Sequence, residues 1–185
     1  MVSSSTVARL FLSGTLFLAQ SSLAHTKLFG VVGGKNCLRP TSDGNNPIKD
    51  VSAPDMTCGK GETKAEAVCD VKAGGKVSLQ FGHNSAADDV VAASHVGPCN
   101  VYLAASKNGE KAPTDGWFKI YEENFKDGKW CTMRVKDGKG ILEVPIPEGV
   151  AAGSYVMRSE LLALHEGNQK GKSQFYVFWY DNRPT

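Results

Sequence analysis

The sequence is short of several features that would place it in a common class of protein. Past residue 24 it has no apolar run approaching 18 residues, the length that a membrane-spanning helix needs. Its 21 basic and 19 acidic residues nearly cancel, and no segment is basic enough for nucleic-acid binding. No segment has a convincing helical period either. We therefore expect a protein without a membrane span, without a nucleic-acid partner and with little helix.

The first 24 residues have the pattern of a secretory signal. Arg9 is their only charged residue, and residues 10–18 form a short apolar stretch. Small residues stand at Ser22 and Ala24, three and one positions before a predicted cleavage after Ala24. We therefore expect residues 1–24 to be removed and the mature protein to be secreted and extracellular.

Cleavage after Ala24 would make His25 the first residue of the mature chain. An N-terminal histidine offers a metal two nitrogens, its α-amine and one ring nitrogen. The alternative is that a histidine follows the cut by chance. Residues 25–185 are long enough for one domain with a substantial core, and we predict a single domain there.

The five cysteines of this predicted secreted chain indicate disulfide bonds with one thiol left over. Any of the five can be the odd one, and the remaining four allow three connectivities. The sequence pattern alone does not choose among these pairings.

Most of the chain after residue 24 has the period-two pattern of half-buried strands. Val77, Leu79 and Phe81 alternate with polar residues, and Leu142, Val144 and Ile146 repeat the pattern around Glu143. Further strand-like segments, separated by Gly, Pro, Asn and Asp, are residues 26–32, 100–104, 117–121, 154–164 and 174–180. This pattern predicts an all-β, antiparallel β-sandwich with long decorating loops, such as residues 35–76.

Two more segments carry candidate site residues. His95 lies in a loop that leads into the strand at 100–104, and Gly97-Pro98 restricts its position. On the last strand, alternation places Gln174 and Tyr176 on one face, and His165 precedes that strand. The alternatives are a solvated histidine and a core tyrosine. Residues alone indicate a secreted β-sandwich with a possible metal site.

The chain also resembles a known family in several blocks that occur in the same order. The resemblance is to the fungal lytic polysaccharide monooxygenases of auxiliary activity family nine, formerly glycoside hydrolase family 61. The blocks are residues 25–27, 46–51, 55–58, 71–75, 94–103, 116–120, 129–132, 158–165 and 174–176.

The resemblance implies an immunoglobulin- or fibronectin-like sandwich that binds one copper ion. The ligands would be the α-amine and ring of His25, one ring nitrogen of His95, and Tyr176 in an axial position. His165 and Gln174 would contact the reacting oxygen and act in catalysis. Three nitrogens with a distant axial oxygen suit copper.

The implied activity is oxidative cleavage of cellulose or a related β-1,4-glucan at C1 or C4. An external electron donor and dioxygen or hydrogen peroxide would be partners, and a monomer is expected. Tyr180 is a candidate substrate contact on the copper face. Hydrolysis would instead need two carboxylates flanking the bond, and no such pair stands out in the sequence.

The resemblance also implies disulfide pairs and shows departures. It implies the pairs Cys99 with Cys131 and Cys37 with Cys69, which leaves Cys58 free. Many relatives carry a cysteine where this chain has Trp179. Longer members of the family have a C-terminal loop that does not occur in this sequence up to Thr185. Ser159 stands where many relatives have a histidine, and we interpret this substitution as neutral.

Two other functions remain open at this stage. The arrangement of the His25 α-amine, the His25 ring and the His95 ring around one copper ion is called a histidine brace. A non-catalytic histidine-brace protein would bind copper without oxidising a glycan, although such proteins tend to change the residues that correspond to Tyr176, Gln174 and His165. A carbohydrate-binding or other secreted interaction protein would not bind copper tightly. Copper titration and product analysis separate the three.

Overall fold

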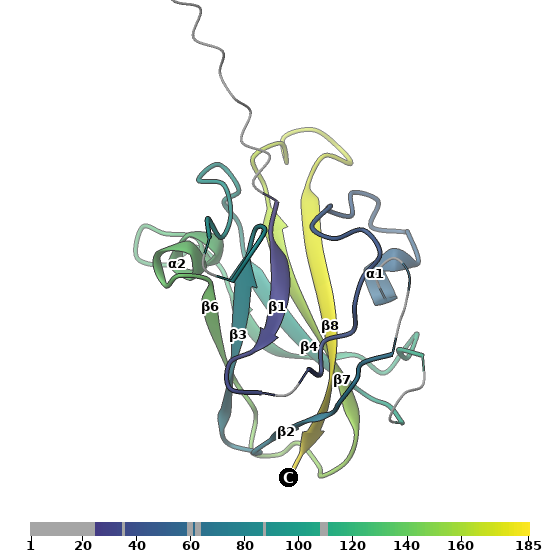
Figure 1. Cartoon of the computed structure of the whole chain (residues 1–185). Coiled ribbons are helices and arrows are strands. Elements are labelled where there is room, and N and C mark those ends of the chain that lie inside the picture. Colours follow the sequence, from purple (N-terminus) through teal and green to yellow (C-terminus); the bar gives the residue numbers. More distant parts are fainter. Residues whose placement is uncertain (1–24, 35, 59–60, 62–63, 87, 108–110) are drawn as a thin grey trace, which may run out of the picture.

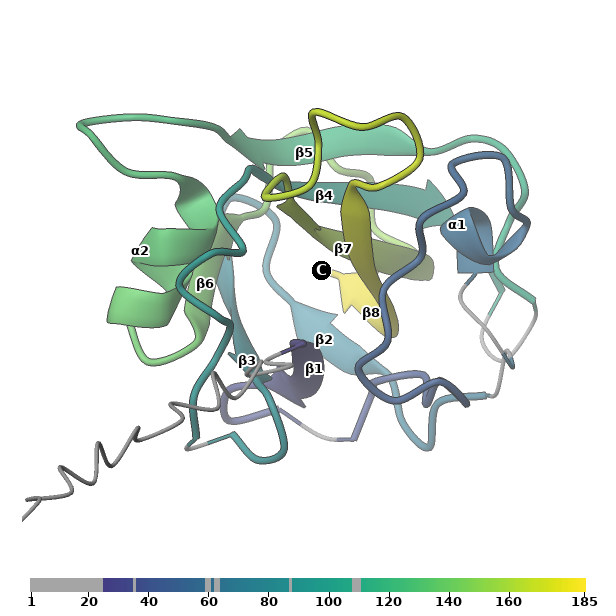
Figure 2. The ribbon, with the colours of Figure 1, turned by 90° about the horizontal axis from the view of Figure 1, so that it is seen from above.

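Two β-sheets form the framework of the computed structural model, which describes residues 25–34, 36–58, 61, 64–86, 88–107 and 111–185. The predicted signal, residues 1–24, lies outside the described residues. The three-stranded sheet has the order β1-β3-β6, with β1 Lys27–Val31, β3 Lys76–Gly82 and β6 Ile141–Pro145. The five-stranded sheet has the order β2-β8-β7-β4-β5, with β2 Cys69–Val71, β8 Gln174–Pro184, β7 Tyr155–Ala163, β4 Cys99–Ala105 and β5 Phe118–Glu123. Figures 1 and 2 show the two sheets from the side and from above.

The small sheet confirms the alternation seen in the sequence. Leu79 and Phe81 of β3 and Leu142 and Val144 of β6 are buried, whereas Glu143 is exposed. The two strands pair antiparallel, with Leu79 opposite Leu142. Period-two burial therefore sets both the sheet and its register.

The central strand β8 is buried on both faces. Tyr176, Phe178 and Tyr180 join the main core between the sheets. Val177 and Trp179 point the other way and belong to a second cluster, beneath the segments that contain Met56 and Ala112. Long loops cover the outer face of the five-stranded sheet, so the side chains on both faces of β8 are shielded from solvent.

The structure corrects one predicted role on this strand. Tyr180 has 0% of its surface exposed, and its hydroxyl contacts the sulfur of Met157. A side chain enclosed in the core cannot touch a polysaccharide. The prediction that Tyr180 contacts substrate is therefore wrong.

Three short elements were not predicted from the sequence. β2 lies within the segment assigned to a long loop and pairs parallel with the end of β8, so this sheet is mixed rather than purely antiparallel. Two short helices are α1, Asp55–Cys58, and α2, Cys131–Asp137. All three are too short to show a clear period, and tertiary contacts decide their conformation. Among the described residues, no helix is long and apolar enough to cross a membrane.

Trp179 links β8 to helix α1. Its side chain is 1% exposed, and its indole nitrogen donates a hydrogen bond to the carbonyl of Thr57 at 2.7 Å. Thr57 directly precedes Cys58, whose side chain lies outside what the structure describes. A buried indole therefore connects β8 to α1 at the position where the resemblance implies a cysteine in many relatives.

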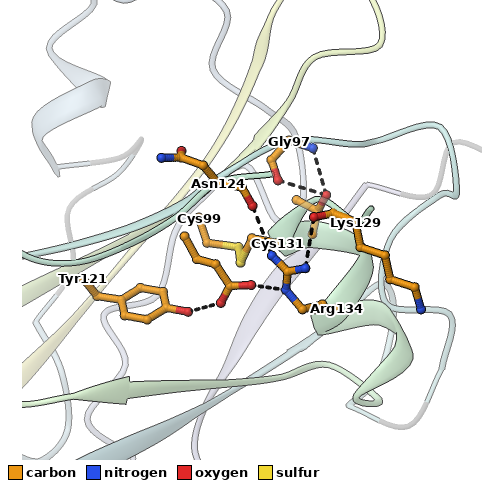
Figure 3. Close-up of a disulfide and its surroundings, with 9 residues drawn as sticks. Gly97, Cys99, Tyr121, Asn124, Lys129, Cys131 and Arg134 are labelled. Atoms are coloured by element: carbon orange, nitrogen blue, oxygen red, sulfur yellow. Dashed lines mark hydrogen bonds and ion pairs between the residues drawn. A yellow bond between two sulfur atoms is a disulfide. The ribbon is translucent and has the colours of Figure 1, made fainter. Parts of the chain in front are cut away.

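Two disulfides join Cys37 to Cys69 and Cys99 to Cys131, the same pairs that the family resemblance implies. The second one ties α2 to the start of β4 (Figure 3). Beside it, Arg134 forms an ion pair with Glu123 and donates hydrogen bonds to the carbonyls of Lys126, Lys129 and Asn124. The start of α2 is thus fixed by one covalent bond and one guanidinium.

We expect the Cys99→Ala/Cys131→Ala double variant to lower the free energy of unfolding by about 3 to 4 kcal/mol, the loop-entropy value for a bridge of this separation. Both bridges span 32 residues, so Cys37→Ala/Cys69→Ala is a matched comparison and should cost about the same. Denaturant unfolding of the three proteins measures this. A difference of more than about 2 kcal/mol between the two double variants would contradict the entropic account.

Candidate metal site

Four chain segments converge at the end of the sandwich opposite the C-terminus. The described chain begins there beside β1, β7 ends there, β8 begins there, and the loop before β4 lies next to the end of β7 (Figure 1). These segments carry His25, His165, Gln174 and His95 respectively. Antiparallel pairing of β4, β7 and β8 brings the segments of His95, His165 and Gln174 together, because the ends of paired strands lie side by side. His25 precedes β1 in the other sheet, and the packing of the two sheets places it beside them.

The aromatic rings of the candidate ligands lie close to one another. The centroid of the His25 ring is 6.2 Å from that of His95 and 5.9 Å from that of Tyr176. The His95 and Tyr176 centroids are 6.0 Å apart. His25, His95 and Tyr176 therefore form a nearly equilateral group of rings, and the sequence-predicted set is brought together in one place.

His95 has the environment of a metal-binding imidazole. It is 6% exposed, and its Nε2 is buried with no hydrogen-bond partner among the described residues. Its Nδ1 lies 3.2 Å from the hydroxyl of Ser94. Burial lowers the pKa of His95 to about 4, and the nearby His165 and His25 add to this effect. The ring is therefore neutral at ordinary pH, and a buried nitrogen without a partner is costly unless it has a ligand.

His25 is less enclosed but also favours the neutral form. Burial lowers its pKa, and His83, Lys49 and His165 lower it further. Among the described residues, no group of three or more His, Cys, Asp or Glu side chains is placed to hold a metal ion. A metal between His25 and His95 would therefore need another donor, and the α-amine of His25 would supply it once residues 1–24 were removed.

Gln174 connects the remaining predicted residues through its side-chain amide. Its Oε1 accepts a hydrogen bond from the Tyr176 hydroxyl at 2.7 Å, and its Nε2 lies 3.3 Å from Nε2 of His165. Burial raises the pKa of Tyr176, so the phenol stays protonated and keeps donating to Gln174. The His165 ring in turn stacks on His95, with centroids 4.2 Å apart. The three side chains thus form one connected group beside the two candidate ligands.

Glu166 also belongs to this group, although no sequence motif indicates a role for it. Gln174 Nε2 donates a hydrogen bond to Glu166 Oε2 at 3.3 Å, and Lys49 lies 3.6 Å from the same oxygen. With one amide end bonded to Tyr176 and the other to Glu166, the orientation of the Gln174 amide is set. The only sequence signal was that Glu166 follows His165 directly.

A cavity of about 1000 Å³ opens beside these residues. Its lining residues come from six separate stretches of the chain, and most of them are polar or charged. The lining residues are His25, Asn46, Pro47, Lys49, Asp89, Ala92, Ala93, Ser94, His95, Lys136, His165, Glu166 and Gln174. The three histidines and Gln174 therefore border one cavity that opens to solvent, although His95 and Gln174 are themselves largely buried.

This donor set fits copper. It offers two neutral imidazoles, one with an unpartnered buried nitrogen, and a protonated phenol in contact with one of the rings. Nitrogen donors with a distant, weak oxygen are typical of copper sites, whereas hard cations such as Mg²⁺ or Ca²⁺ require several oxygen ligands.

The fold and the site together define an all-β sandwich with a two-histidine, one-tyrosine candidate metal site at one end. The family model described as Auxiliary Activity family 9 (formerly GH61) matches residues 5–178, and the chain belongs to this family. Its predicted membership and fold class are thereby confirmed.

Curated relatives carry the family name. The chain is 42% identical over 136 residues to an AA9 family lytic polysaccharide monooxygenase A of Aspergillus terreus. The aligned region covers 72% of this chain and 37% of the relative. The chain is also 39% identical over 140 residues to an AA9 family lytic polysaccharide monooxygenase B of Emericella nidulans, and the aligned region covers 74% of this chain and 38% of that relative. The chain thus matches less than half the length of these relatives.

Solved structures agree with the fold. The structure titled CvAA9A superimposes with a TM-score of 0.80 at 26% identity, covering 87% of this chain and 78% of that one. The extended catalytic domain of H. jecorina LPMO9A gives a TM-score of 0.68 at 28% identity, covering 80% and 61%. The sandwich of this chain is therefore the one that the family shares.

We expect Tyr176→Phe to change copper binding by less than about threefold, because the nitrogens would hold the metal, while slowing turnover about tenfold. Without the hydroxyl, Gln174 Oε1 loses its donor and the amide loses one of its two restraints. Isothermal titration, electron paramagnetic resonance and rate measurements test this. Tyr121→Phe removes a phenol that donates to Glu123 and does not line the cavity, so it serves as the control. An unchanged spectrum and rate for Tyr176→Phe would contradict the axial role.

Proposed function

We propose that this chain is a secreted, copper-dependent lytic polysaccharide monooxygenase that cleaves a β-1,4-glucan such as cellulose oxidatively at C1 or C4. The observation that carries the proposal is the buried Nε2 of His95, which has no hydrogen-bond partner in the part of the chain that the structure describes and lies beside the rings of His25 and Tyr176. Family membership and the names of the curated relatives support the reaction class.

In this proposal His25 would hold copper through its α-amine and one ring nitrogen and His95 through one ring nitrogen, with the Tyr176 hydroxyl as an additional, weaker ligand. Copper held there supplies one-electron redox chemistry, in which an external donor provides electrons and dioxygen or hydrogen peroxide oxidises the C–H bond at C1 or C4. The protein keeps both imidazoles neutral by burial, so that neither needs to lose a proton before binding.

The remaining residues orient reactants and handle protons. Gln174 presents its amide with Oε1 bonded to Tyr176 and Nε2 directed toward His165 and Glu166. His165 Nε2 accepts from that amide or exchanges a proton with a reactant in the cavity. The stacked His95 ring keeps the His165 ring in place. These contacts support roles for His165 and Gln174 in positioning the oxidant and delivering protons.

The test is product analysis with the mature protein, beginning at His25 and loaded with one copper ion. Cellulose, ascorbate and hydrogen peroxide are added, and soluble products are analysed by mass spectrometry. Aldonic acids are expected from oxidation at C1 and 4-ketosugars from oxidation at C4. The same reaction after copper removal by a chelator is the control.

Two results would overturn the proposal in different ways. Tight copper binding without oxidised products would indicate a protein that carries or sequesters copper. Weak copper binding together with retention on cellulose would indicate a carbohydrate-binding protein. Size-exclusion chromatography tests the expected monomer.

A further inference from the structure

Helix α2 is attached to the loop that carries His95 at two points, one on each side of the histidine. Thr132 contacts Gly97, which lies two residues after His95, and Lys136 contacts Val91, which lies four residues before it. Thr132 and Lys136 are one helical turn apart and face the same way. The helix therefore brackets the segment 91–97 with His95 between its two attachments.

The Thr132 attachment is buried and uses both polar atoms of Gly97. The hydroxyl of Thr132 accepts a hydrogen bond from the Gly97 nitrogen at 3.0 Å and donates one to the Gly97 carbonyl at 3.2 Å. The Thr132 backbone nitrogen donates to the same carbonyl at 3.2 Å. Thr132 is 1% exposed and does not line the cavity, so it can affect the site only through the loop.

Strand β7 encloses Gly97 from the opposite side. The nitrogen of Leu164 donates to the Val96 carbonyl, and the nitrogen of Leu162 donates to the Pro98 carbonyl. A Cβ atom at Gly97 would collide with the carbonyl of Leu162. The backbone after His95 is thus held tightly between β7 and α2, and Figure 3 shows Gly97 beside the start of the helix.

The Lys136 attachment and the disulfide complete the connection. The Lys136 ammonium donates to the Val91 carbonyl at 2.7 Å and pairs with Asp89 at 3.1 Å. The Cys99–Cys131 bridge ties the first residue of α2 to the first residue of β4. The helix is therefore fixed to the strand that follows the loop and cannot move independently of it.

The His95 ring itself has few restraints. Its Nε2 has no hydrogen-bond partner within the described part of the chain, and its Nδ1 lies 3.2 Å from the hydroxyl of the neighbouring Ser94. Stacking on His165 limits the tilt of the ring but gives little control over sliding. The position of Nε2 therefore depends mainly on where the backbone is anchored.

We propose that Thr132 is a positioning residue for His95: by bonding both polar atoms of Gly97, it holds the loop so that Nε2 of His95 faces His25. This inference rests on the proposed copper site. It assigns to a buried hydroxyl on α2 a role in metal affinity that is separate from any role in folding.

The experiment compares Thr132→Val, which keeps the shape but removes the hydroxyl, with Thr132→Ser, which keeps the hydroxyl. Ser159→Ala is the matched control, because Ser159 is also fully buried and its hydroxyl donates to the Phe178 carbonyl, away from the loop. Copper affinity is measured by titration on each mature protein. The copper spectrum is recorded by electron paramagnetic resonance, and thermal unfolding is measured without metal.

We expect Thr132→Val to bind copper about tenfold more weakly, with a broadened spectrum, in line with the effect of removing groups that orient metal ligands. Thr132→Ser and Ser159→Ala should stay within about twofold of the parent protein, even where Ser159→Ala lowers the melting temperature as much as Thr132→Val does. If Thr132→Val does not fold, Thr132→Ala removes the same hydroxyl without a branched side chain against Gly97, and the same expectations apply.

The outcomes separate the two proposals. Parent-like affinity and spectrum in Thr132→Val would overturn the positioning role and leave the proposed function standing. Equal weakening in Ser159→Ala would also overturn it, because the effect would then follow general stability. Failure of the parent protein to bind copper would overturn the proposed function, and the positioning role with it.

Discussion

Placing a single glycine before His25 is expected to weaken copper binding by more than about 100-fold. This loss is larger than the roughly 10- to 100-fold loss of affinity that follows when a residue hydrogen-bonded to a metal ligand is removed. The extension converts the α-amine into a peptide nitrogen, whose lone pair is delocalised into the amide and is not a neutral donor. Among the described residues, no group of three His, Cys, Asp or Glu side chains is placed to hold the metal without this nitrogen. Oxidised products should disappear as well.

The measurement needs two proteins that differ only at the terminus, one beginning at His25 and one at Gly-His25. Copper titration, the copper spectrum and product analysis are compared, and thermal unfolding without metal is the control. The melting temperature should not change, because the main core begins at Leu28 and does not include His25. Equal copper affinity and equal products from the two proteins would contradict the histidine-brace interpretation and the proposed enzyme activity.

His95→Ala is expected to have an effect of similar size, again more than about 100-fold on copper affinity with loss of oxidised products, because it removes the nitrogen opposite His25. The mature N-terminus would remain, so His25 alone would hold the metal through two donors. Titration and product analysis measure the loss.

His83→Ala is the matched control for His95→Ala. His83 lies close enough to lower the pKa of His25, yet it does not line the cavity. Its removal should leave copper affinity within about threefold of the parent protein, since it changes only a long-range charge. If His83→Ala abolished binding and His95→Ala did not, the assignment of the second histidine would be wrong.

Much of the β-sandwich was predictable because half-buried strands alternate apolar and polar residues with a period of two. The alternation at Leu79 and Phe81 predicted β3, and the alternation around Glu143 predicted β6. The last strand was predicted to end at residue 180, but β8 continues to Pro184. Asp181 and Asn182 still pair with β7, and residues 182–184 pair with β2. The second contact joins segments more than 100 residues apart and leaves no local pattern.

Several residues were misread or missed because their neighbours are distant in sequence. Tyr180 was expected at the surface, but β8 is covered on both faces and its rings are enclosed. Trp179 looked like the loss of a cysteine, whereas its indole bonds Thr57. No sequence pattern gave Glu166 or Thr132 a role at the site, and only the fold brings them to Gln174 and Gly97.

The sequence by itself determined the strand pattern and the excess of one cysteine over two pairs, because these depend on residue type and local spacing. Its resemblance to a family nominated His25, His95, His165, Gln174 and Tyr176. Only the tertiary structure decided that these side chains meet, that Nε2 of His95 is buried with no partner among the described residues, and that Tyr180 is inaccessible. The physical reason is that burial and contact are set by strand pairing across the whole chain, and no local segment records which distant residue will cover it.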